Sequence, residues 1–130
     1  MLLYSAELVA RMPPFGAALD THPLPVNEVD AYEILLPLRY NDGRPTESAK
    51  FDQTNLDLIE RFAATTTDVI PAVGRWRYRG ALYEDLVLRL IIDVPASEPA
   101  DEFVRNCKEV LKVRFEQIDI WISSHEIQIL

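Results

Sequence analysis

Residues 86–93 read LVLRLIID and form the most apolar run of the 130-residue chain. The run is far shorter than the roughly 20 apolar residues of a membrane span, and no other stretch of the chain approaches that length. A strand this apolar is typical of the centre of a β-sheet, where neighbouring elements shield it from water. We therefore place the run in a central strand over residues 82–94.

The preceding residues 68–79 (DVIPAVGRWRYR) predict a strand that a hairpin turn at Gly80-Ala81 joins to the central one. The aromatic side chains of this hairpin should face the core together with the leucines of LVLRLIID. These aromatic residues are Trp76, Tyr78 and Tyr83. Strict alternation fails by one residue between Tyr83 and Leu86, so we predict a bulge at Glu84-Asp85. Without a bulge, the arginines of the first strand would point into the core, at a cost of several kcal/mol for each unpaired ion.

Residues 31–40 (AYEILLPLRY) predict another strand. It should bulge or end early at Pro37, because proline has no amide hydrogen to donate. Apolar residues at helical spacing predict one helix from residue 46 or 47 to 64 and a second from residue 98 or 99 to 116.

The C-terminal segment adds a strand over residues 118–122 and a further short strand over residues 125–130. The order strand, helix, strand, strand, helix, strand, with right-handed crossovers, predicts the ferredoxin-like α+β fold. In that fold an antiparallel sheet carries both helices on one face, and the first and third strands are central. These two strands are also the most apolar of the chain, which supports the assignment.

The first 29 residues differ in composition from the rest of the chain. Four of the nine prolines fall close together there and exclude a continuous helix. These prolines are Pro13, Pro14, Pro23 and Pro25. We expect residues 1–29 to form a separate arm, either disordered or a short helix followed by extended chain. Residues 30–130 should form the single domain. Met12 is an alternative start of the protein.

Several segments of this domain resemble a bacterial family of small uncharacterised proteins. The segments are YEILLPLRYNDGRP, GRWRYRG with LYED, IIDVP and RFEQIDIWI. The resemblance covers residues 31–130 and leaves the N-terminal arm unmatched. It supports the ferredoxin-like fold and implies no activity, cofactor or catalytic residue.

The chain is acidic, with 21 acidic and 13 basic residues and a formal net charge of -8. A field of this sign repels phosphate, so generic binding to nucleic acid or to an anionic membrane is not expected. The single cysteine, Cys107, excludes an intramolecular disulfide and fits a reducing compartment. The N-terminal residues lack the basic region of a signal peptide, and Glu7 interrupts their apolar run. We therefore expect a cytoplasmic protein.

The sheet face without helices should carry a basic surface. Alternation along the strands places five arginines and a tryptophan on it, namely Arg39, Arg75, Arg77, Arg79, Arg89 and Trp121. A face with mixed apolar and charged groups is typical of a surface that binds a second copy or another protein. The alternatives are a ligand site and a solvated face, on which Arg89 pairs with Asp93 or Glu33.

The run Arg75-Trp76-Arg77-Tyr78-Arg79 is the strongest local departure from the acidic average. Three guanidinium groups spaced about 7 Å apart on one strand face could hold phosphates or carboxylates. Stacking of nucleic-acid bases would require outward-facing aromatic rings, whereas Trp76 and Tyr78 are expected to face inward. Nucleic-acid binding is therefore not favoured.

We predict no catalytic group, no metal site and no cofactor. The chain lacks a nucleophile with an oriented base, a phosphate loop and a dinucleotide fingerprint. Cys107 lies on the apolar stripe of the second helix, where a buried structural thiol is expected. A metal site would need chance assembly of Asp20, His22, His125 and Glu126. The adjacent acids Glu84 and Asp85 are weak candidates for a functional site. Adjacent carboxylates are more typical of a solvent-exposed corner of the sheet.

The sequence thus favours a non-catalytic protein-interaction or regulatory module that acts as a homodimer or as a subunit of a larger assembly. The alternative is a small-molecule-binding protein or enzyme of the dimeric α+β type, with its pocket between sheet and helices. The third hypothesis is binding of nucleic acid or another anion through Arg75, Arg77 and Arg79.

Overall fold

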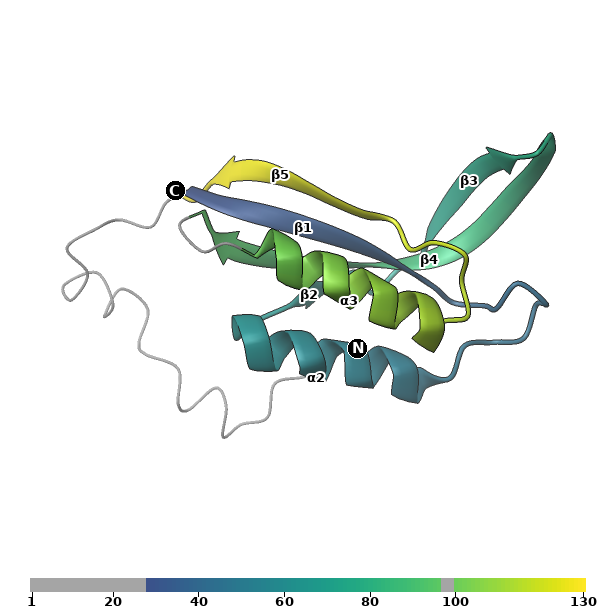
Figure 1. The fold of residues 1–130 in the computed structure, drawn as a ribbon, viewed down its shortest axis with the longest axis horizontal. Coiled ribbons are helices and arrows are strands. Elements are labelled where there is room, and N and C mark those ends of the chain that lie inside the picture. The colour runs from purple at the N-terminus through teal and green to yellow at the C-terminus, as the bar shows by residue number, and fades with distance from the viewer. Residues whose placement is uncertain (1–27, 97–99) are drawn as a thin grey trace.

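The computed structural model describes residues 28–96 and 100–130, which form one antiparallel sheet and two helices (Figure 1). The strands are β1 (Glu28–Pro37), β2 (Thr66–Thr67), β3 (Ala72–Tyr78), β4 (Ala81–Pro95) and β5 (Ile122–Gln128), and the helices are α2 (Ser48–Phe62) and α3 (Asp101–Arg114). The strand order is β2-β4-β1-β5, and β3 also pairs with β4. The predicted ferredoxin-like α+β fold is confirmed. The arm predicted over residues 1–29 lies outside the described residues, except for the first two residues of β1.

The two central strands are β1 and β4, as their apolar character predicts. They pair without a break from Val29 opposite Pro95 to Pro37 opposite Val87. The strand ends at Pro37, in agreement with the early end expected there. On its other edge, β1 pairs with β5, and Ile34 lies opposite Ile122.

Both helices lie on one side of the sheet, which we call the helix side (Figure 1). Every second residue of β1 and β4 points to that side and packs against the helices; the strand residues are Tyr32, Ile34, Leu36, Leu90, Ile92 and Val94. From the helices, Leu58, Val104 and Leu111 complete the core together with Phe115, whose ring meets that of Phe51 edge-on at 5.3 Å. None of the helices in the described residues is long and apolar enough to span a membrane.

The predicted bulge at Glu84-Asp85 is wrong. Strands β3 and β4 pair in unbroken register, with Trp76 opposite Tyr83 and Arg75 opposite Glu84. A bulge would be needed only if the helices covered the whole strand. A strand of 15 residues is about 50 Å long, whereas a helix of 15 residues is about 22 Å long, so the helices cannot reach its full length. Figure 1 shows the β3–β4 hairpin extending past the helices.

The hairpin turn and the last strand also differ from expectation. The turn residues are Arg79 and Gly80, both with positive φ (49° and 79°), which is typical of the two-residue turn that matches strand twist. The last strand is one continuous element from Ile122 to Gln128, because Ser123 and Ser124 pair with β1 and do not interrupt it. Residues 118–121 therefore connect α3 to the sheet and are not a strand.

Candidate functional site

The six residues predicted to share the uncovered face do not all lie there. Arg89 and Trp121 do. Arg89 alternates with the core leucines of β4. The backbone N–H of Leu35 donates a hydrogen bond to the carbonyl oxygen of Trp121 at 3.0 Å, so Trp121 lies opposite Leu35 and alternates with the pair Ile34–Ile122. Arg75 and Arg77 alternate in the opposite sense and lie on the helix side of the hairpin, beyond the helices. The prediction that the arginines gather on one face is therefore wrong for these two.

The other two arginines lie outside the strands. Arg79 is part of the hairpin turn, with its guanidinium 5.2 Å from the ring centre of Tyr78. Arg39 lies in the loop after β1, where it forms an isolated bridge with Pro45. Neither residue lies within a strand of the sheet.

Arg89 is held in an ion-pair network on the uncovered face. Its guanidinium lies 2.9 Å from Asp68 Oδ2 and 3.3 Å from Glu33 Oε1. Pairing of Arg89 with Glu33 was one of the expectations for a solvated face, and the geometry supports it. The positive charge of Arg89 is therefore compensated by carboxylates of the same chain.

The aromatic side chains of the hairpin form a cluster on the side of the uncovered face. This aromatic cluster consists of Trp76, Tyr78 and Tyr83. The rings of Trp76 and Tyr83 stack at 4.6 Å, and Tyr78 lies 6.1 Å from Trp76. The indole N–H of Trp76 donates a hydrogen bond to Asp85 Oδ2 at 2.6 Å. The inward orientation predicted for these rings is wrong, and strict alternation without a bulge would have found the outward one.

The helix side of the hairpin is also exposed and partly apolar. Counted over both of its sides, the hairpin exposes six large apolar side chains by 41–62% each, namely Val73, Trp76, Tyr78, Leu82, Tyr83 and Leu86. On the helix side, the charged residues of the hairpin are Arg75 and Glu84, which pair at 3.3 Å, and Arg77. Soluble chains seldom leave this much apolar surface together in water unless it binds something.

A hollow of about 480 Å³ lies between the hairpin and the loops that follow β1 and α3. Its walls include the aromatic cluster, Arg39, Tyr40, Glu84, Asp85 and Ile118. Glu84 and Asp85 take different partners, Arg75 and Trp76, and alternate to opposite sides of the strand. They therefore do not form a carboxylate pair of the kind used in acid-base catalysis.

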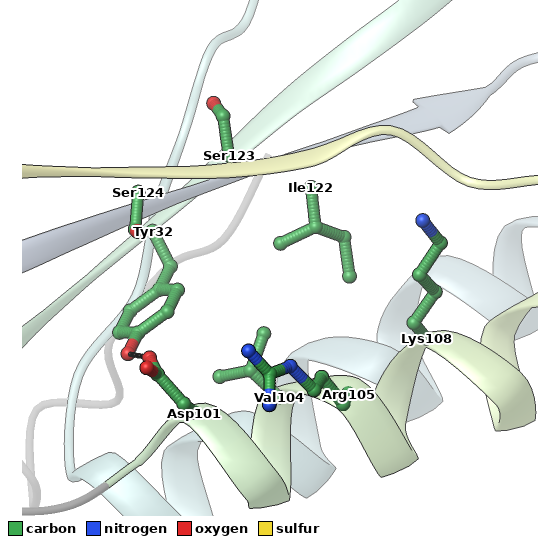
Figure 2. A pocket seen from close by; sticks show the side chains of 8 residues that line it. All are labelled: Tyr32, Asp101, Val104, Arg105, Lys108, Ile122, Ser123 and Ser124. Carbon is green, nitrogen blue, oxygen red and sulfur yellow. Dashed lines mark hydrogen bonds between the residues drawn. The ribbon is translucent and has the colours of Figure 1, made fainter.

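A second hollow of about 290 Å³ lies between α3 and the edge strand β5 (Figure 2). Its walls are Tyr32, Asp101, Val104, Arg105, Lys108, Ile122, Ser123 and Ser124. The hydroxyl of Tyr32 donates a hydrogen bond to Asp101, and Lys108 forms an ion pair with Asp119 at 2.9 Å. Burial, together with this hydrogen bond, raises the pKa of Tyr32 to about 12.

Tyr32 should make the stability of the fold sensitive to alkaline pH. Its pKa in the folded chain lies above the unfolded value of 10.0, so the neutral phenol stabilises the fold below that pH. This contribution is lost as the pH rises from about 10 towards 12. In urea denaturation, we expect the free energy of unfolding to fall less steeply over this range in Tyr32→Phe than in the unaltered chain. Equal slopes would contradict the burial of this phenol beside Asp101.

The remaining candidate residues do not assemble into a catalytic or metal site. Cys107 is half-buried beside the core, and burial raises the pKa of its thiol, which disfavours the reactive thiolate. His125 lies on β5 opposite Ala31. Within residues 28–96 and 100–130, no group of three or more His, Cys, Asp or Glu side chains could hold a metal ion.

Comparison with known proteins shows the fold. No protein-family model and no curated protein matches the chain, so its resemblance to a bacterial family stays a prediction. Among solved structures, a phage SAM lyase in the apo state is similar with a TM-score of 0.55 and 15% identity, covering 84% of this chain and 88% of that one. The same kind of enzyme in complex with S-methyl-5'-thioadenosine has a TM-score of 0.52 and 13% identity, covering 77% and 89%.

A third similar structure is a divalent cation tolerance protein (CutA1) from Thermus thermophilus. It has a TM-score of 0.51 and 17% identity, and the match covers 75% of this chain and 82% of that one. At these identities, the likeness supports the ferredoxin-like fold and carries no activity to this chain.

Proposed function

We propose that the protein is a non-catalytic protein-interaction module, acting in the cytoplasm as a homo-oligomer that assembles through the β3–β4 hairpin. The observation that carries the proposal is the hairpin itself, which extends past the helices and exposes six large apolar side chains. Its composition also fits, because tryptophan, tyrosine and arginine are enriched where protein interfaces gain most of their binding energy.

The charge distribution favours contact between copies. Residues 72–86 contain three arginines and two carboxylates, a net charge of +1, whereas the whole chain carries -8. The rest of each copy is therefore strongly acidic. A weakly basic hairpin that meets an acidic body is attracted to it, whereas two acidic bodies repel each other.

The proposal predicts that the hairpin controls the oligomeric state. We expect the unaltered chain to sediment well above its monomer mass of 14.9 kDa. The double variant Trp76→Ser with Leu82→Ser, which alters both sides of the hairpin, should weaken self-association at least about tenfold because hot-spot truncations cost more than about 1.4 kcal/mol. The matched control is Val113→Ser on α3, where valine is 80% exposed, and it should leave self-association unchanged.

Sedimentation at several concentrations, with circular dichroism to show that each variant is folded, measures this prediction. A strictly monomeric unaltered chain would overturn the proposal. Equal weakening by the hairpin and control variants would also overturn it, because general loss of apolar surface would then be the cause.

Binding of a small molecule is the second candidate function. The hollow of about 480 Å³ falls within the usual range of ligand pockets, about 300–1,000 Å³, and the aromatic cluster offers rings on which a planar ligand could stack. A fold of the same kind binds S-methyl-5'-thioadenosine in the phage SAM lyase. If the chain proves monomeric in the sedimentation experiment, self-association is excluded and binding of a small molecule becomes the favoured function.

The third hypothesis, binding of nucleic acid through the arginines of β3, is not favoured by the geometry. Arg75 and Arg77 lie on the side of the hairpin opposite to the aromatic cluster. A nucleic-acid strand whose bases stacked on the aromatic cluster would lie beside the carboxylate of Asp85 and away from these two guanidinium groups.

A further inference from the structure

Two strand edges of the sheet are open. In the sheet order, β5 is the last strand on one side, and on the other side β3 pairs only with β4 (Figure 1). Among the residues that the structure describes, nothing pairs with the outer edge of either strand. Both strands contain seven residues and contain no proline. Open edges of this kind present unpaired N–H and C=O groups that readily take up another strand.

The directions of the two edges are compatible with pairing between copies. Strand β4 is antiparallel to both β1 and β3, and β1 is antiparallel to β5. It follows that β3 and β5 run in opposite directions. The β3 edge of one copy can therefore extend the sheet of the next copy at β5 with the same antiparallel pattern, while both copies keep their helices on one side.

The side chains of the two edges are complementary when the helix sides are kept together. On that side β3 carries Arg75 and Arg77, and β5 carries Ser124 and Glu126. Placing Arg75 opposite Glu126 aligns residues 73–78 of one copy with residues 123–128 of the next. An opposite-charge pair directly across two strands is stabilising.

The same register also matches the other side. Trp76 then lies opposite His125 and diagonal to Ile127, so the apolar part of the aromatic cluster meets an apolar residue of β5. Arg77 lies opposite Ser124, which lines the hollow of about 290 Å³ beside Asp101 (Figure 2). The second copy would thereby add a cation to the mouth of that hollow.

Pairing of identical edges is less favourable. Two β3 strands aligned about a twofold axis would bring Arg75 opposite itself or opposite Arg77, and like charges opposite each other are destabilising. Pairing of two β5 strands would leave the apolar hairpin uncovered. Contact between different edges avoids both problems.

We propose that β3 of one copy pairs with β5 of the next, with Arg75 opposite Glu126 of the neighbouring copy. This inference rests on the proposed function and assigns the surface that self-association uses. Because the two contact surfaces differ, one contact between two copies leaves a free β3 edge and a free β5 edge, so further contacts follow until the free edges meet and close a ring.

Disulfide trapping tests the pairing in the full-length chain, in a Cys107→Ala background that contains no other cysteine. The variants Arg75→Cys and Glu126→Cys, co-expressed as separate chains, should form a covalent dimer under mild oxidation. Each variant alone should form none. A chain that carries both substitutions should form a ladder that ends at the mass of the ring. Tyr78→Cys with Ser123→Cys tests the same register and keeps the Arg75–Glu126 pair.

Charge reversal is the second measurement. Arg75→Glu and Glu126→Arg should each weaken self-association by about tenfold, and their combination should restore much of it, because the opposite charges are then exchanged. The matched control is Glu60→Arg on the exposed face of α2, which makes the same charge change away from both edges. It should not reproduce the effect of Glu126→Arg.

The outcomes separate this inference from the proposed function. A monomeric unaltered chain overturns both. An oligomer that gives no cross-link with either cysteine pair overturns the pairing of β3 with β5 and leaves assembly through another part of the hairpin. Cross-linking of Arg75→Cys alone would show two β3 strands together and would likewise overturn it.

Discussion

Replacement of Phe115 by alanine is expected to lower the free energy of unfolding by about 3–5 kcal/mol. The side chain is 0% exposed, contacts Phe51 edge-on, and lies in the cluster that joins both helices to the sheet. Its backbone N–H bonds to the carbonyl oxygen of Leu111 at 2.9 Å, so the backbone fixes the position of the ring. Truncation would leave a cavity that the neighbouring side chains cannot fill without moving.

Urea denaturation at neutral pH measures this loss, and Phe115→Leu is the milder variant if the alanine variant does not fold. The control is Val113→Ala, two residues away on α3, where the side chain is 80% exposed. It should change the free energy of unfolding by no more than about 0.5 kcal/mol. A loss below about 1 kcal/mol for Phe115→Ala would contradict the central place of this ring in the core.

Phe115 also shows which features the sequence could predict. Its place on the apolar stripe of the second helix follows from local spacing, and so do the buried positions of Val104 and Leu111. Val110 belongs to the same predicted stripe but is 51% exposed, because a stripe defined by spacing alone is wider than the contact with the sheet. The order of helices and strands was sufficient to predict the ferredoxin-like topology, because few arrangements of these elements have right-handed crossovers.

The hairpin surface was predicted with the wrong orientation for a physical reason. The predicted bulge keeps Arg75 and Arg77 out of the core only if the core covers the entire hairpin. The side chain of Arg75 is 62% exposed, so the assumed cost of burial does not arise. Comparing the lengths of strand and helix would have shown that the end of the hairpin lies beyond the helices. The hollows depend on contacts between distant segments, which local periodicity does not report.

Replacement of Arg114 is the second change with a large expected effect. Like the hollows, the contacts of Arg114 join distant segments and could not be predicted from the sequence. The residue ends α3, and its guanidinium donates hydrogen bonds to Asp57 Oδ2 and Thr54 Oγ1 of α2, both at 2.8 Å. Its side chain is 19% exposed and Thr54 is 1% exposed, so water cannot fully replace these bonds. We expect Arg114→Met to destabilise the fold by about 2 kcal/mol, because the charge-assisted bonds are lost and two partners are left behind.

The same ion pair should shape the response to acid. The hydrogen bond from Arg114 holds the pKa of Asp57 below its ordinary value. A lowered pKa means that the contribution of Asp57 to stability is present above the unfolded pKa of about 4 and is lost as the pH falls through the folded value. We therefore expect Arg114→Met to lose less stability than the unaltered chain between pH 5 and pH 2, when each is compared with its own value at neutral pH.

Urea denaturation of the two proteins across this pH range measures both effects. Asp57→Asn, combined with Arg114→Met in a double-mutant cycle, isolates the coupling between the two side chains. The control is Lys108→Met, which removes the surface pair with Asp119, whose carboxylate is 64% exposed. Solvent screens that pair, so its loss should cost no more than about 1 kcal/mol. Equal losses for Lys108→Met and Arg114→Met would show that the link between the two helices contributes no more than an ordinary surface ion pair.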